Sequence, residues 1–213
     1  MTRFAGRRIL RARCCGATFA ERNYSSMNYS GAEFWTDGRI FAPLVPNDDG
    51  VRRCVCGCYF LIRNADQIAA LPRDSIISPP EAAQRVPDAD TGALLASGIA
   101  DEDMLIVLRR RHWRQLNNPY RVVYRQHRET DQSTFPTYEP TEAQRDNMTA
   151  LLGLLATEGA VDWLEVSELH RELDQPQEAQ SALNRAGGLE KDRVAIWQKM
   201  IDEGFTGPMR YRL

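Results

Sequence analysis

The chain has 213 residues, of which 43% are hydrophobic, and a formal net charge of −2. This length suits one domain of ordinary size with an appendage, or two small domains. The longest apolar runs, Met104–Leu108 and Ala150–Ala156, are far shorter than the roughly 20 residues that span a bilayer. Met1–Arg13 is basic but lacks the apolar core of a signal peptide. We therefore expect no membrane partner and a cytoplasmic location.

Positive charge is concentrated in two parts of the chain. Residues 1–63 hold ten arginines and five acidic residues, a local net charge of +5. Residues 109–128 hold seven arginines, two histidines and no acidic residue. These clusters favour a nucleic-acid partner, whereas the overall charge of −2 argues against a dedicated nucleic-acid binder.

Residues 9–63 are predicted to form a small β-rich module. Asp37-Gly38 is a turn signal, and the polar segments Asn23–Gly31 and Pro43–Gly50 are predicted to be loops. The segments with the polarity pattern or apolar content of strands are Ile9–Arg13, Ala32–Trp35, Arg39–Phe41 and Cys58–Ile62.

A short helix is expected at Asn64–Leu71, because Asn64 can cap it and Pro72 limits its end. It would complete a first domain of residues 1–71. Residues 72–91 carry four of the eleven prolines and are expected to form a linker or an ordered surface loop.

From residue 92 the pattern becomes helical. Apolar residues between Leu94 and Leu116 predict helices that Thr91 or Asp101 can cap. Asn117-Asn118-Pro119 is expected to end this run, since the residue before a proline disfavours the helical conformation. Residues 126–140 are polar and contain two prolines, which predicts a second loop.

The remainder of the chain is predicted to be helical as well. Thr141–Leu155 begins with a capping box, since Gln144 follows Thr141 by three residues. Gly187-Gly188 and Gly204 are stop signals for the last two helices. Met209–Leu213 is a candidate terminal strand. The three later helices are expected at about Val161–Leu173, Gln177–Ala186 and Glu190–Glu203.

The cysteines form two groups separated along the chain. In a cytosolic protein such grouping favours a metal site over disulfides. Zinc takes about four ligands in a tetrahedron, and two short turns that face each other can supply two thiolates each. The expected zinc ligands are Cys14, Cys15, Cys54 and Cys56, with Cys58 as an alternate ligand.

Two glycines support this interpretation, and two other positions complicate it. Gly16 and Gly57 each follow a cysteine, where the backbone must curl for its N–H groups to point at sulfur. A zinc knuckle has the pattern Cys-x-x-Cys-Gly, but Ala12 and Arg53 occupy the places of the upstream cysteines. Three interpretations therefore stay open: a bound zinc, a degenerate ribbon held by packing without metal, and a redox or disulfide role.

A bound metal would contribute folding free energy directly. Three arginines lie beside the cysteines in the sequence, at Arg13, Arg52 and Arg53. Their positive charges are expected to lower the thiol pKa values and to balance the charge of the thiolates.

Several segments together resemble a group of uncharacterised bacterial proteins. Members of that group have a zinc-ribbon-like head and a tetratricopeptide-like helical tail, so the resemblance implies an architecture and no activity. The segments that carry it are Cys15–Ala17, Asn28–Ala32, Phe34–Gly38, Ala42-Pro43, Cys56-Gly57 and Arg110–Tyr120.

Residues 161–186 resemble a single tetratricopeptide repeat. Large and small residues alternate at the repeat positions Trp163, Val166, Ser167 and His170 in the first helix, and Ala179, Leu183 and Ala186 in the second. Small residues let two helices approach closely. One repeat needs packing neighbours, which the helix at 190–203 would supply as a cap. The predicted fold class is α+β: a small β-rich, zinc-ribbon-like module followed by an all-α region at 92–213.

Candidate partner-binding side chains come from the head and from the helices. The aromatic residues of Asn23–Trp35 are either interface anchors or the core of the small module. The arginines of residues 109–128 either form a nucleic-acid surface or complement a helix dipole, with Trp113 in the core. The expected partner-binding residues are Tyr24, Tyr29, Trp35, Arg110, Arg114 and His170.

No catalytic triad, phosphate-binding loop or zinc-protease motif occurs in the sequence. The leading hypothesis is a non-catalytic protein–protein interaction protein, of adaptor or cognate-inhibitor (immunity) type, that uses the helical hairpin and the aromatic head. The first alternative is a zinc-ribbon nucleic-acid-binding protein. The second is a thiol-based enzyme or redox sensor.

Overall fold

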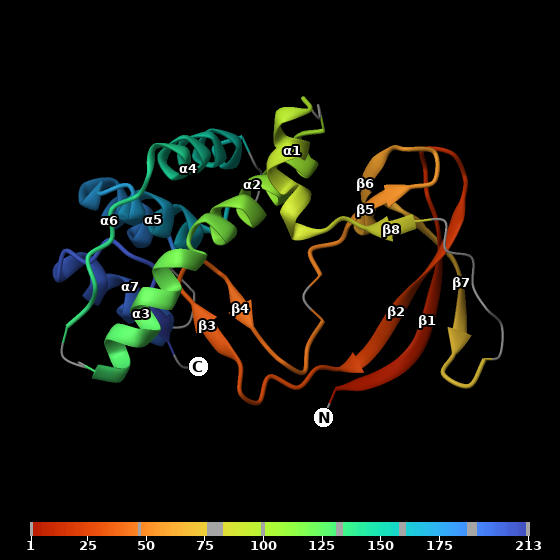
Figure 1. Cartoon of the computed structure of the whole chain (residues 1–213), viewed down its shortest axis with the longest axis horizontal. Coiled ribbons are helices and arrows are strands. Elements are labelled where there is room, and N and C mark those ends of the chain that lie inside the picture. The colour runs from red at the N-terminus through yellow and green to blue at the C-terminus, as the bar shows by residue number, and fades with distance from the viewer. Residues whose placement is uncertain are drawn as a thin grey trace. The chain divides into compact units, whose positions relative to one another are not determined.

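Small antiparallel sheets precede a set of helices along the chain, which confirms the predicted α+β class (Figure 1). The computed structural model describes residues 2–46, 48–75, 83–98, 101–130, 134–157, 161–186 and 191–211. The chain divides into two compact units. Unit 1 comprises Met1–Ala32 and Phe41–Met104, and unit 2 comprises Glu33–Ile40 and Leu105–Leu213.

Unit 1 contains two three-stranded antiparallel sheets, with strand orders β2-β1-β7 and β6-β5-β8. The 3₁₀ turn η2 (Asp88–Asp90) and helix α1 (Thr91–Ala96) follow the strands. The strands are β1 (Arg3–Arg11), β2 (Thr18–Ser26), β5 (Val51–Cys54), β6 (Tyr59–Leu61), β7 (Asp66–Pro72) and β8 (Ala83–Arg85).

The core of unit 1 lies next to the cysteines. Leu10 on β1 is paired with Phe19 on β2, and both side chains are buried. Ala12 and Cys54 complete the same apolar cluster. The turns that carry the cysteines are therefore anchored at their base by a small hydrophobic core.

Gly6 allows β1 and β7 to approach each other. Its φ is +131°, and a Cβ at this position would lie 2.2 Å from the carbonyl oxygen of Leu71. Glycine is the residue that tolerates both the backbone angle and the close contact.

The predicted helix at Asn64–Leu71 is wrong. The 3₁₀ turn η1 (Ile62–Asn64) ends there, and β7 then pairs with β1. Ladder hydrogen bonds to a strand far away in the sequence override the local capping signal. The predicted loop at Asn23–Gly31 is also partly strand, since β2 continues to Ser26.

The predicted linker at 72–91 contains regular structure. β8 pairs with β5 within it, so this segment takes part in unit 1. Residues 76–82, with two of the linker prolines, lie outside the described residues. The sequence placed residues 1–71 in one domain, whereas Glu33–Ile40 belong to unit 2.

Unit 2 is mainly helical. A short sheet has the strand order β4-β3-β9, with β3 at Glu33–Trp35, β4 at Ile40–Phe41 and β9 at Arg210–Tyr211. The helices are α2 (Glu102–Leu116), α3 (Asn118–Thr130), α4 (Glu142–Leu155), α5 (Trp163–Glu172), α6 (Pro176–Arg185) and α7 (Lys191–Asp202).

Most predictions for the helical region are confirmed. Thr141 and Gln144 form the expected capping box at the start of α4, and β9 occupies the candidate terminal strand. The stop at Gly187-Gly188 lies outside the described residues. The predicted loop at 126–140 begins later than expected, because α3 continues to Thr130 and Pro119 occupies its first turn, where proline is tolerated.

Two apolar clusters form the core of unit 2. In the first, Trp113 of α2 packs with Met148 of α4 and Leu169 of α5. In the second, Leu183 of α6 packs with Trp197 of α7. Within the described residues, no helix combines the length and hydropathy needed to cross a membrane.

Candidate metal centre

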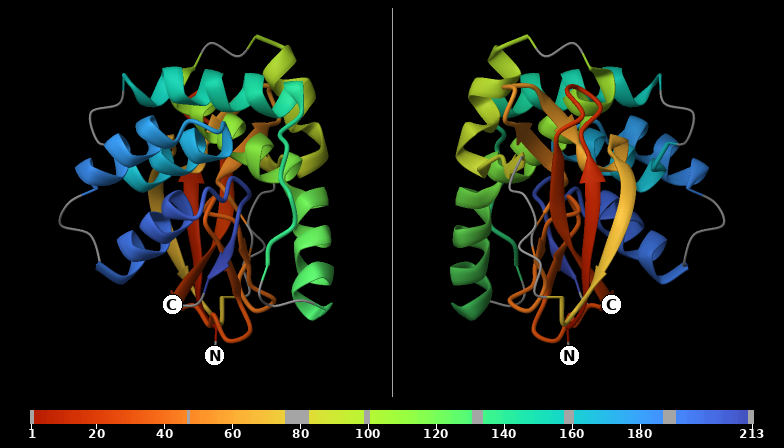
Figure 2. Two further views of the ribbon diagram at one scale, coloured as in Figure 1. Left: turned by 90° about the vertical axis from the view of Figure 1, so that its left-hand side faces the viewer. Right: turned by 90° about the vertical axis from the view of Figure 1, so that its right-hand side faces the viewer.

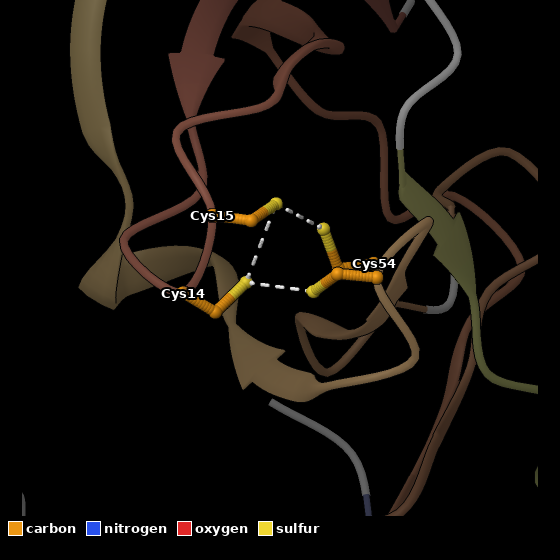
Figure 3. Close-up of side chains that lie close together, drawn as sticks. Cys14, Cys15 and Cys54 are labelled. Carbon is orange, nitrogen blue, oxygen red and sulfur yellow. Dashed lines mark hydrogen bonds between the residues drawn. The ribbon is translucent and has the colours of Figure 1, made fainter.

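Four thiol groups converge at one end of unit 1. Their sulfur atoms all lie within 4.8 Å of one another. Figure 3 shows Cys14 and Cys15 on one turn and Cys54 facing them from another. The residues are Cys14, Cys15, Cys54 and Cys56, which are the four expected ligands. Cys58 is not one of these four, although its thiol contacts those of Cys56 and Cys14.

The sulfur–sulfur distances fit a tetrahedral zinc site. Cys15 Sγ lies 3.4 Å from Cys54 Sγ, and Cys14 Sγ lies 3.5 Å from Cys56 Sγ and 4.0 Å from Cys15 Sγ. Four ligands at the usual Zn–S distance of about 2.3 Å are separated from one another by about 3.8 Å. A disulfide requires about 2.05 Å, and all five cysteines are free.

The first turn of the site follows β1. The N–H of Ala12 donates to the carbonyl of Ala17 at 2.8 Å, and the N–H of Gly16 donates to the carbonyl of Ala12 at 2.8 Å. Gly16 has a φ of +75°, which glycine adopts without steric cost. This curl leaves Cys14 and Cys15 exposed on the outside of the turn.

The second turn follows β5 and repeats this design. The N–H of Cys54 donates to the carbonyl of Cys58 at 2.8 Å, and that of Gly57 to the carbonyl of Cys54 at 2.9 Å. Gly57 has a φ of +92°. Cys54 is 3% exposed and occupies the first position of the turn, as buried Ala12 does in the other turn.

Backbone amides act on one sulfur in each turn. The amide of Ala17 contacts the Cys15 sulfur, and the amide of Cys58 contacts the Cys56 sulfur. Each donor lies two residues after its acceptor. N–H donors stabilise the charged form of a thiol. The second turn therefore favours a thiolate at Cys56, whereas at Cys15 the effect of the Ala17 amide is outweighed by the neighbouring thiols, so the pKa of Cys15 is raised overall.

The thiols have unequal pKa values. The amide of Cys58, assisted by the thiol of Cys14, lowers the pKa of Cys56 to about 6. Partial desolvation of its sulfur, together with the neighbouring thiols, raises the pKa of Cys14 well above its usual value. A crowd of four thiols cannot all ionise without a cation among them. The arrangement is therefore chemically suited to a divalent metal.

The nearby arginines interact with carboxylates. Arg13 donates to Asp66 through Nε at 3.0 Å and through Nη2 at 2.6 Å. Buried Arg52 donates to Glu21 at 2.7 Å and to Asp48. The acidic partners thus offset the lowering of the thiol pKa values that was expected from Arg13 and Arg52. The ion pairs of these two arginines instead connect the strands around the site.

The predicted partner-binding aromatics of unit 1 are accessible. Tyr29 is 44% exposed. Tyr24 is half-buried on β2, where its ring contacts Phe4 edge to face at a centroid distance of 6.2 Å. A partner protein could therefore contact both rings.

Trp35 has a different environment. It is 1% exposed, contacts the ring of Tyr124 at 5.0 Å, and has the guanidinium of Arg125 5.3 Å from its ring centroid. Its ring is part of the core of unit 2. Of the two interpretations of the aromatic segment, interface anchor or core residue, Trp35 is therefore a core residue.

The predicted polar partner-binding residues of unit 2 are engaged within the unit. Arg110 forms a two-bond pair with Glu165 at 2.6 and 2.7 Å. Arg114 Nε donates to the backbone carbonyl of Asp37 at 3.1 Å. His170 is half-buried and interacts with Gln175 at 2.7 Å. Of the residues predicted to form sites, the structure therefore brings only the cysteines together.

Sequence reasoning missed a buried polar network in unit 2. One carboxylate oxygen of Glu172, which is fully buried, accepts from Trp113 Nε1 at 2.8 Å, Asn117 Nδ2 at 2.9 Å and Tyr138 Oη at 3.1 Å. Burial raises the pKa of Glu172 well above its usual value.

A second part of the network begins at Asp37, which the sequence identified as a turn residue. It is 1% exposed and pairs with fully buried Arg121. Next to it, Thr36 donates to Glu168, which also pairs with Arg171. Charged residues at core-facing positions of α5 could have indicated a buried network in the sequence. Their partners outside α5 are far away in the sequence, so those contacts could not be predicted.

Comparison with known proteins finds no match to this chain among protein-family models, curated proteins or solved structures. The resemblance to the bacterial zinc-ribbon-like group therefore stays a prediction.

Proposed function

We propose that the chain binds one zinc ion through Cys14, Cys15, Cys54 and Cys56, and that this metal stabilises the N-terminal unit of a non-catalytic interaction protein. The observation that carries the proposal is the convergence of these four sulfurs within 4.8 Å. A reducing cytoplasmic location, which the sequence predicts, would keep the thiols available to metal.

The ligand set favours a structural metal over a catalytic one. Four thiolates complete the tetrahedron of zinc and leave no position for a reactive water. Soft thiolate ligands also select zinc over magnesium or calcium, which prefer oxygen ligands. The core beneath the turns, with Leu10 and Phe19, links metal binding to the folding of unit 1.

Metal analysis of the purified chain tests this proposal. We expect close to one zinc per chain, and we expect Co²⁺ to give the intense absorption of a tetrahedral thiolate complex. Cys54→Ser should reduce zinc content severely, since it removes the buried ligand. Cys58→Ser is the comparison variant, because Cys58 contacts the cluster without belonging to the four convergent thiols, and it should retain more metal than Cys54→Ser.

Zinc-free protein with an unchanged fold, or equal metal loss in Cys54→Ser and Cys58→Ser, would contradict the assignment. A disulfide between the two turns after purification under reducing conditions would instead support the redox alternative.

For unit 2 we propose that the helices bind a partner protein. Support comes from the interior, in which Glu172, Glu168 and Asp37 are all held by hydrogen bonds within the unit. These hydrogen bonds stabilise the fold, and all three carboxyl groups are buried inside the unit. Val122 and Val123 are adjacent on α3 and are 51% and 50% exposed, which provides an apolar contact surface.

Photo-crosslinking from position 122 in the native host tests this second part. One crosslinked protein, lost in Val123→Asp, is the expected result. Crosslinks that are equally frequent from Thr149, which is an exposed polar position on α4, would contradict a specific protein interface.

A further inference from the structure

The sheet of β2, β1 and β7 has one face that packs on the core and one that does not. Leu10 and Phe19 are buried on the inner face. The pairing register places alternate residues on the other side, here called the outer face. The right-hand view of Figure 2 shows the three strands running side by side, with β1 and β2 in red and β7 in yellow.

No residue of the outer face is buried. The face contains charged, aromatic and small apolar side chains in alternating rows along the strands. From one end to the other it comprises Arg11, Thr18 and Asp66, then Ile9, Ala20 and Ala69, then Arg7, Arg22 and Leu71, and then Phe4 and Tyr24. Register shifts between Phe4 and Gly6 and between Ile9 and Leu10 bring Phe4 and Asp66 into these rows.

The arginine row of the outer face is electrostatically unfavourable by itself. Arg7 lies directly opposite Arg22, and cross-strand neighbours have Cβ atoms roughly 5 Å apart. Like charges at this separation destabilise a sheet. Within the described residues, neither guanidinium has an ion pair or hydrogen bond. An anionic ligand would relieve this repulsion.

The other arginine-rich segment, residues 109–128, does not offer comparable free charge. Arg121 pairs with Asp37, Arg125 pairs with Glu33, and Arg110 pairs with Glu165. Arg7 and Arg22 differ from these three arginines, since no carboxylate pairs with either of them in the described part of the chain.

An aromatic pair lies next to the arginine row. Phe4 and Tyr24 are half-exposed and pack edge to face. Flat aromatic rings on an open sheet surface stack with unpaired bases, and arginines between them bind phosphates. From Phe4 to Arg11 the strand extends roughly 20 Å at about 3.3 Å per residue, which accommodates several nucleotides.

We propose that the outer face binds single-stranded nucleic acid, with Arg7 and Arg22 on the phosphates and Phe4 and Tyr24 stacked on bases. An acidic peptide would satisfy the arginines but would make no use of exposed stacking surfaces. A duplex would present its phosphates while its bases stay stacked inside. The combination of free guanidinium groups and open rings thus distinguishes the single strand.

Fluorescence anisotropy with labelled oligothymidylate and oligouridylate tests the charge component. The double variant Arg7→Glu/Arg22→Glu should bind at least about tenfold more weakly at low salt, because two phosphate contacts are lost. The slope of log affinity against log salt should become shallower by roughly 1.4, at about 0.7 per phosphate for single strands.

The matched control is Arg145→Glu/Lys199→Glu, which changes the net charge equally at exposed positions of unit 2. It should bind nearly as wild type does. The test variant replaces one like-charged pair by another, so far-ultraviolet circular dichroism and zinc content should match those of wild type and confirm the fold.

The stacking component is tested at Tyr24. Tyr24→Ala should weaken binding roughly tenfold, since stacking contributes about 1–3 kcal/mol per base, whereas Tyr24→Phe should retain most of the affinity. Polyglutamate and duplex DNA are the competitors. The proposal is overturned if the arginine variant binds normally, if Tyr24→Ala has no effect, or if either competitor displaces the strand as effectively as unlabelled single strand.

Discussion

Glu172 is a buried carboxyl group with three hydrogen-bond donors around one of its oxygens. The desolvation cost of its charged form exceeds what these donors return, so its pKa is raised in the folded state. An acid whose pKa rises on folding binds more protons in the folded state than in the unfolded one. Its contribution to stability is greatest at low pH and is lost as the pH rises.

We therefore expect stability to fall as the pH rises above the usual glutamate pKa, by up to about 1.4 kcal/mol per pH unit for one proton. Glu172→Gln should flatten this dependence, because the amide oxygen can still accept from Trp113, Asn117 and Tyr138. Urea denaturation followed by tryptophan fluorescence at several pH values measures it. Glu129→Gln, at an exposed position of α3, should leave the wild-type pH dependence intact.

At the scale of the single helix, α4 illustrates how a local signal acts. Thr141 Oγ1 accepts from the amide of Gln144, and the Gln144 side chain accepts from the amide of Thr141. The two bonds satisfy N–H groups that have no partner within the helix.

Thr141→Ala should destabilise unit 2 by about 1 kcal/mol through loss of this cap. Thr149→Ala is the control, since Thr149 is exposed in the middle of the same helix and alanine is the better helix former. It should be neutral or slightly stabilising in the same denaturation experiment. Equal destabilisation by Thr141→Ala and Thr149→Ala would show that the loss of stability does not come from the cap.

The pairing of β1 with β7 depends on Gly6. Gly6→Ala should destabilise unit 1 by at least about 2 kcal/mol, because the new Cβ meets the Leu71 carbonyl and the φ of +131° is strained for alanine. Gly98→Ala separates the two causes, since Gly98 has a φ of +73° and open space around it. It should cost less in thermal unfolding, and a larger effect at Gly98 would show that the strand contact is unimportant.

Elements with local signals could be predicted from the sequence. The α4 start follows from residues three apart, and α5 and α6 lie within about two residues of their predicted bounds. The segment Asn64–Leu71 could not be predicted, because β7 exists through its pairing with distant β1. Likewise, nothing near Asp37 indicates that it pairs with Arg121.

The cysteine site shows the same division. Grouping and the adjacent glycines identified the four cysteines whose sulfurs converge, because these are local features. Which sulfur faces which, such as Cys15 with Cys54 at 3.4 Å, depends on how the two turns are positioned by the sheets. The sequence does not encode that geometry in any short segment.

At the scale of the whole molecule, the two units have separate sources of stability. Unit 1 combines a small core with the cysteine cluster, and unit 2 has two larger apolar clusters. A small domain with little buried apolar surface depends strongly on a structural metal.

A zinc chelator should therefore unfold unit 1 and leave unit 2 folded. Hydrogen exchange should show rapid loss of protection in β1, β2 and β5, with α4 and α5 unchanged. Readdition of zinc should restore the protection. Cooperative loss of both units on chelation would contradict separate stability.

The β3 strand and the Asp37 turn precede the helices of unit 2 by more than sixty positions in the chain, and the partner strand β9 begins only at Arg210. During synthesis on the ribosome, this early strand therefore remains without that neighbour until Arg210 and Tyr211 have emerged. A nascent chain arrested before residue 210 would hold Glu33–Trp35 as an unpaired edge, so this part of the fold closes only after the helices of unit 2 have been synthesised.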